Sequence, residues 1–160
     1  MTELERIQDQ MKRAYEGEAW HGPSVRETLA DISAKTATSR PLPGAHNIWE
    51  LVLHIAAWKA AVRRRLEGDR AQLSPEEDWP AVIETDEAAW NSTRDALERA
   101  HANLLAAVAR LDDSMLHEPI LPGMSSRYIT LHGVIQHDLY HTGQIGILKK
   151  AQTSAENFSN

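Results

Sequence analysis

Apolar residues recur every three to four positions through most of this 160-residue chain, and this spacing limits its fold more than any other feature. Amphipathic helices have that spacing, whereas half-buried strands alternate apolar and polar residues. Helix-start signals support the same interpretation, because three pairs of residues have capping-box spacing: Thr2 with Glu5, Ser24 with Glu27, and Ser74 with Glu77. The sequence therefore predicts an all-α fold.

Four long segments carry this pattern, over about residues 3–16, 47–67, 86–111 and 130–151. A short extra helix should follow the first one, beginning at Ser24. The connection over residues 69–84 should hold at most one helical turn, after Ser74, and the tail from residue 153 to 160 should fray. We find no repeat and no coiled-coil heptad, so the expected architecture is a four-helix bundle in a single domain spanning residues 1–160.

Composition excludes several classes of function. The formal net charge of −6 disfavours a nucleic-acid partner, because phosphate binding needs a basic face. The chain has no cysteine, and so has no disulfide, thiolate metal ligand or cysteine nucleophile. Neither a signal peptide nor an apolar run near the ~18 residues of a membrane span is present. We therefore expect a cytoplasmic protein with no membrane partner.

Two histidines of the last predicted helix, His137 and His141, are separated by four residues. Residues at this spacing lie on one helical face with about 5–6 Å between their Cβ atoms. Both imidazoles can therefore approach one metal ion at the about 2.0–2.1 Å typical of zinc–nitrogen bonds. A chain with eight histidines also produces such a pair by chance, so the pair alone is a modest signal.

A third candidate ligand, His54, lies on the apolar stripe of the 47–67 helix, between Leu51 and Trp58. A polar ring at such a position needs a partner, and a metal ion shared with His137 and His141 would supply one. The alternative is a core histidine hydrogen-bonded to a carbonyl or carboxylate, which spacing does not exclude. Three neutral histidines would leave open coordination positions, as in catalytic zinc sites, and imidazole also suits nickel, iron and copper.

Two polar residues near these histidines have competing interpretations. Gln144 follows His141 by three residues and could orient metal-bound water or substrate, or could simply be solvated near the helix end. Glu50 precedes His54 by four residues and could orient its second ring nitrogen, although Asn47 with Glu50 also matches a capping box.

The remaining candidates are weaker. Asp138 points about 100° away from His137 around the helix, which makes contact with the metal ligands doubtful. Trp58 is expected in the core more than in a pocket lining. The other histidines are expected at the surface: His21, His46, His101, His117 and His132.

Two segments resemble the DinB/YfiT-like family of metal-dependent four-helix-bundle proteins. Residues 46–58, HNIWELVLHIAAW, resemble the family segment with its first histidine, and residues 133–145, GVIQHDLYHTGQI, resemble the segment with the other two. The stretches 20–24 and 40–44 also resemble family members, so the likeness spans nearly the whole chain.

The resemblance implies a metal site of His54, His137 and His141, holding nickel or zinc and completed by water, in a protein that forms homodimers. Where the family often has glutamate, this chain has Lys59, a change expected to alter the rim of the site. Family members include thiol S-transferases that use bacillithiol, mycothiol or glutathione, a mycothiol-dependent isomerase, and proteins described as hydrolases without a known substrate.

These observations lead to two hypotheses. In the first, the protein is a metal-dependent enzyme, a thiol S-transferase or hydrolase, whose ion activates a water or a low-molecular-weight thiol cofactor to act on a small-molecule substrate. In the second, it is a non-catalytic metal-binding or stress-response protein whose ion ties the second and last long helices together. Fold analogy does not choose between them.

Overall fold

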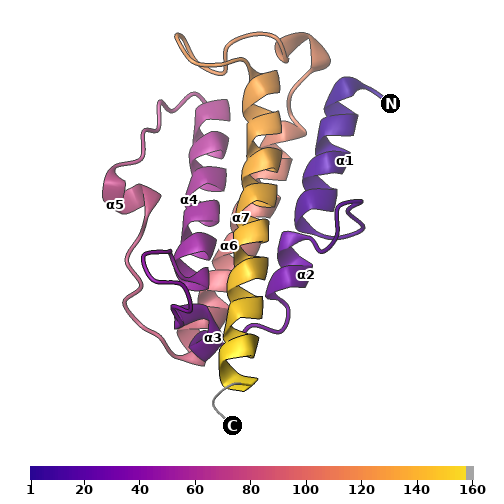
Figure 1. The fold of residues 1–160 in the computed structure, drawn as a ribbon. Coiled ribbons are helices and arrows are strands. Elements are labelled where there is room, and N and C mark those ends of the chain that lie inside the picture. The colour runs from indigo at the N-terminus through magenta and orange to yellow at the C-terminus, as the bar shows by residue number, and fades with distance from the viewer. Residues whose placement is uncertain (158–160) are drawn as a thin grey trace.

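The computed structural model describes the backbone of residues 1–157 and the side chains of residues 1–152. Within this range the fold is all-α, as the apolar spacing predicts. Four long helices dominate it (Figure 1): α1 (Glu3–Tyr15), α4 (Ile48–Leu66), α6 (Glu87–Val108) and α7 (Arg127–Asn157).

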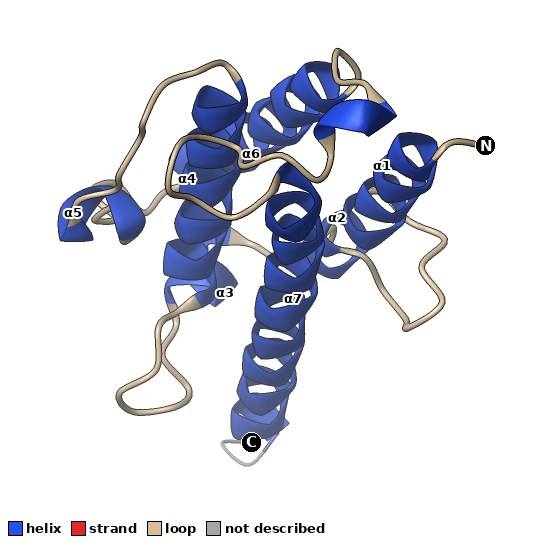
Figure 2. Cartoon of the chain, turned by 90° about the horizontal axis from the view of Figure 1, so that it is seen from above, coloured by secondary structure: helices blue, strands red, loops and turns tan. Residues whose placement is uncertain are grey.

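The long helices close into a bundle. Helix α1 contacts α6 and α7, and α4 contacts the same two helices, so each long helix packs mainly against two other long helices (Figure 2). One apolar cluster fills the half of the bundle that contains Trp49, Trp90 and Ile145. A second cluster, containing Ile7 and Leu131, fills the half near the start of α1. Each half of the bundle therefore has its own apolar cluster, and α4 lies beside α7.

Helix starts follow the expected capping signals. Four helices begin with a complete capping box, at Thr2, Ser24, Asn47 and Ser74. In this arrangement the cap side chain accepts the backbone N–H of the residue three positions later, whose own side chain accepts the backbone N–H of the cap. This confirms the short extra helix after α1, which is α2 (Val25–Leu29), and the single turn α5 (Pro75–Asp78).

Two short elements were not predicted. Helix α3 (Ala34–Thr38) begins at Ser33, whose side chain accepts the Thr36 N–H, but the chain has no acidic or amide residue at position 36 to complete a recognisable box. A 3-10 turn, η1 (Asp113–Met115), follows α6. Helix α6 itself ends at Val108, three residues earlier than expected.

The last helix is longer than predicted at both ends. It begins at Arg127 instead of residue 130, because the Ser126 hydroxyl accepts the Ile129 N–H one turn earlier. It also continues past residue 151 to Asn157, so the prediction of a frayed tail from residue 153 is wrong as far as 157; no Gly or Pro interrupts residues 147–157. Residues 158–160 lie outside the described range.

Among the described residues, no helix is both long enough and apolar enough to cross a lipid bilayer.

Candidate metal centre

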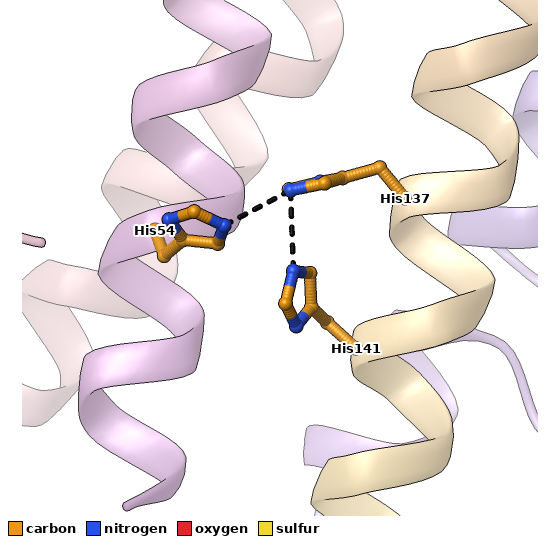
Figure 3. A group of neighbouring side chains, drawn as sticks. All are labelled: His54, His137 and His141. Atoms are coloured by element: carbon orange, nitrogen blue, oxygen red, sulfur yellow. Dashed lines mark hydrogen bonds between the residues drawn. The ribbon is translucent and has the colours of Figure 1, made fainter. Parts of the chain in front are cut away.

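The three predicted ligands meet between α4 and α7, where they face one another (Figure 3). The Nε2 atom of His137 is 3.0 Å from that of His54 and 3.2 Å from that of His141. Ligand atoms bonded to one tetrahedral zinc ion at about 2.0–2.1 Å are separated by about 3.3 Å. The separation of the three Nε2 atoms therefore suits ligands of one divalent ion, and this group could hold such an ion.

Hydrogen bonds fix two of these rings through their outer nitrogens. The Nδ1 atom of His54 is 2.8 Å from the Asp78 carbonyl oxygen, and that of His141 is 2.6 Å from Gln144 Oε1. Both partners are acceptors, so each Nδ1 must carry the proton and each Nε2 keeps its lone pair. Two lone pairs thus point at the same place, which is the donor arrangement a metal ion requires.

Burial favours the neutral form of His137 and of His141. His54 and His141 are buried and His137 is half-buried. Burial, reinforced by the neighbouring histidines and Lys59, lowers the pKa of His137 to about 3. Burial also lowers the pKa of His141, although its hydrogen bond to Gln144 opposes this. Neutral imidazole is the form that binds metals, so these rings are ready to bind at neutral pH.

The segment after α5 covers His54. The Trp79 ring stacks on the His54 ring with centroids 3.9 Å apart, stacks on His46 at 3.6 Å and meets His141 edge-on at 6.4 Å. The Trp58 indole donates to Asp78 Oδ1 at 2.7 Å. Asp78 and Trp79 were not predicted at the site, because the capping pair at Ser74 indicates a helical turn but no local sequence pattern relates residues 78 and 79 to His54.

The predictions for the residues near the three histidines are confirmed only in part. Gln144 accepts from His141, so it orients a candidate ligand and is not merely solvated. Glu50 completes the α4 capping box and pairs with Arg40 and His46, so the capping interpretation is confirmed and it has no role at His54. Trp58 is half-buried and borders a cavity at His137.

Lys59 is not at the rim of the site, which corrects the expectation from the family resemblance. Its side chain is 1% exposed, and its Nζ lies 2.6 Å from Oδ2 of the equally buried Asp138. Burial raises the pKa of the Asp138 carboxyl, and the Lys59 ammonium opposes this. Asp138 Oδ1 is buried without a hydrogen-bond partner among the described residues. This pair joins α4 to α7 beside the histidines.

The prediction that His101 lies at the surface is wrong. It is 2% exposed, stacks on Tyr15 with centroids 3.9 Å apart, and lies between Lys59 Nζ at 3.5 Å and Glu16 Oε1 at 3.3 Å. These partners supply both hydrogen bonds that a buried neutral imidazole needs. Burial, followed by the charge of Lys59, lowers the pKa of His101 to about 3.

The other histidines lie mostly as expected. His21, His46 and His117 are exposed, although His46 also stacks on Trp79. His132 is half-buried against Tyr128, with ring centroids 4.4 Å apart, so the surface prediction is wrong for it in part.

Two cavities border the histidine cluster. One of ≈ 380 Å³ contacts His141, Gln144 and Trp79, and one of ≈ 250 Å³ contacts His137, Trp58 and Lys59. A larger cavity of ≈ 520 Å³ lies along α2 and α7 and contacts none of the three candidate ligands. His141 and His137 therefore each border a cavity.

Comparisons with known proteins agree with this fold. The model of the DinB superfamily matches residues 19–145, most of the chain, and the protein belongs to that superfamily. A crystal structure of a conserved protein from Enterococcus faecalis is similar in fold, with a TM-score of 0.71 and 17% identity, covering 94% of this chain and 97% of that one. No curated protein matches the sequence.

Proposed function

We propose that this protein is a metal-dependent enzyme acting on a small molecule, by thiol S-transfer or hydrolysis, with nickel or zinc held by His54, His137 and His141. The observation that carries the proposal is the convergence of three Nε2 atoms, two of them on rings whose Nδ1 protons are already bonded elsewhere. An ion held by neutral imidazoles supplies a nucleophile at neutral pH, because it lowers the pKa of a coordinated water or thiol.

The residues around the histidines would keep the site rigid and shielded. Asp78 and Gln144 hold the His54 and His141 rings, and Trp79 covers one face of His54. Such partners of metal-bound histidines fix the ring orientation and raise ligand basicity. Because the chain has no cysteine, a thiol nucleophile would have to come from a low-molecular-weight cofactor.

The catalytic role is favoured over a structural metal by the packing of α4 and α7. These helices already share an apolar core and the Lys59–Asp138 pair, so we expect the bundle to stay folded without an ion. A metal site that is open to two cavities is also typical of catalysis, whereas structural sites are closed.

Turnover assays test this proposal. Protein loaded with zinc or nickel should conjugate glutathione, bacillithiol or mycothiol to monochlorobimane, or hydrolyse 4-nitrophenyl acetate. Chelator-treated protein and the His141→Ala variant should lose at least 90% of that activity. No turnover by any loaded form, together with a bundle that unfolds when the ion is removed, would support a structural metal instead.

A further inference from the structure

The ≈ 380 Å³ cavity ends on the candidate metal centre. Its inner wall includes His141 and Gln144 from α7, Leu51 from α4 and Trp79 from the segment after α5. The volume falls within the about 300–1,000 Å³ of small-molecule sites, which are mostly apolar with a few polar groups. We call it the His141 cavity.

Exposed apolar side chains gather at the mouth of the His141 cavity. Leu42, Tyr140 and Ile147 border it and are 41%, 66% and 60% exposed. Only seven large hydrophobic side chains are exposed among the described residues, and three of them lie at this mouth. Apolar side chains gathered on a surface mark places where another molecule binds.

The lining of the His141 cavity carries no formal charge. None of its described lining residues is Asp, Glu, Lys or Arg, although these types make up 25% of the chain. The cavity at His137 differs, because Lys59 and Arg65 border it. An anionic ligand group held away from His141 in this cavity would lose hydration without gaining a Lys or Arg partner, because a metal ion would attract an anion only beside His141.

We propose that the His141 cavity binds an uncharged apolar group of the substrate, aromatic or branched alkyl, and so places the adjoining reactive group beside His141. This proposal rests on the proposed enzymatic function and narrows its substrate class. Phosphorylated compounds and substrates with a carboxylate on the bound group are thereby disfavoured for this cavity.

A pair of fluorescent probes tests the predicted selectivity. N-phenyl-1-naphthylamine is uncharged, and 1-anilinonaphthalene-8-sulfonate adds an anionic sulfonate to the same ring system. The uncharged probe should show saturable fluorescence enhancement with one site per chain. The sulfonated probe should bind at least tenfold more weakly, and equal binding of the two would overturn the proposal.

Matched variants assign the binding to this cavity. Ile147→Glu and Leu42→Glu each place a carboxylate at the mouth and should weaken binding of the uncharged probe at least tenfold. Both are needed, because Ile147 also borders the ≈ 520 Å³ cavity and Leu42 does not. The control is Ile129→Glu, since Ile129 is also on α7 and 60% exposed but borders neither cavity. It should bind like the unmodified protein; equal loss in all three variants would overturn the assignment.

Two further measurements on the same samples separate the possible failures. If the unmodified protein binds no probe and Ile147→Glu converts a dimer to a monomer in sedimentation, the mouth is an interface between copies and the proposal fails. Metal content is measured in parallel. If the protein holds metal but binds no probe, only the inference about the His141 cavity is overturned. If it binds the uncharged probe but holds no metal, the proposed enzymatic function is overturned and the cavity selectivity is unaffected.

Discussion

At the scale of single residues, a hydrogen bond at Nδ1 of His54 and of His141 fixes the proton on that atom and leaves Nε2 able to bind a metal ion. Gln144→Leu removes the acceptor that holds the His141 ring, so we expect zinc affinity to fall about 10–100-fold. Competition titration against a chelating dye measures this. Gln136→Leu is the control, because Gln136 is exposed on the same helix. Equal affinity in the two variants would mean that Gln144 does not position the ligand.

His101 makes stability depend on pH. Its pKa is 6.5 in the unfolded chain and about 3 in the folded protein, so between these values the unfolded state takes up a proton that the folded state does not. The free energy of unfolding should therefore decrease as the pH falls from 6.5 towards 3, by up to about 1.4 kcal/mol per pH unit from this residue.

The variant His101→Gln isolates that contribution. Urea unfolding between pH 4.5 and 7 should show a shallower dependence than in the unmodified protein, while His117→Gln, which replaces an exposed histidine, should not change it. Identical slopes in all three proteins would show that His101 is not held neutral by the fold.

At the scale of helices, the buried Lys59–Asp138 pair links α4 to α7. Removing one partner leaves an uncompensated buried charge, so Lys59→Met or Asp138→Leu should each cost about 3–5 kcal/mol of stability. The double variant should lose clearly less than either single variant, as a double-mutant cycle by chemical denaturation will show. Arg63→Ala, which breaks the more exposed Arg63–Glu67 pair, should cost at most about 1 kcal/mol. Additive losses in the cycle would contradict the coupling.

The sequence was informative where the structural signal is local. Capping boxes and apolar spacing predicted the four long helices and α2, and the i, i+4 pair on one predicted helix located His137 and His141 on a common face. Two helix starts were missed, at Ser33 and Ser126, where a hydroxyl alone caps the helix. The start of α6 also lacks a complete box, but its Asp86 cap was recognised.

Contacts between distant segments could not be predicted in this way. Lys59 and Asp138 each have an unremarkable position in their own helix, and only packing of α4 against α7 shows that they are buried together. The same applies to His101, which has a surface position by sequence but contacts Tyr15 at the end of α1 and Glu16, the residue that follows it. For the third ligand, His54, the family resemblance was stronger evidence than its position on the apolar stripe of its helix.

At the scale of the whole molecule, the bundle should remain folded without metal. Its two apolar clusters extend through both halves, so the core does not depend on the histidines. Chelator-treated protein should keep its helical circular dichroism at 25 °C, and added zinc at 100 times its dissociation constant should stabilise it by about 2.7 kcal/mol. Loss of helical signal on chelation would identify the ion as structural.

The most direct test of the metal centre is elemental mass spectrometry on untagged protein, with His54→Ala and His137→Ala prepared in parallel. We expect about one nickel or zinc ion per chain in the unmodified protein and a loss of at least 90% in both variants, because the ligands come from two helices. Protein that holds no metal even after reconstitution with either ion, or variants that retain it, would contradict a site built from His54, His137 and His141.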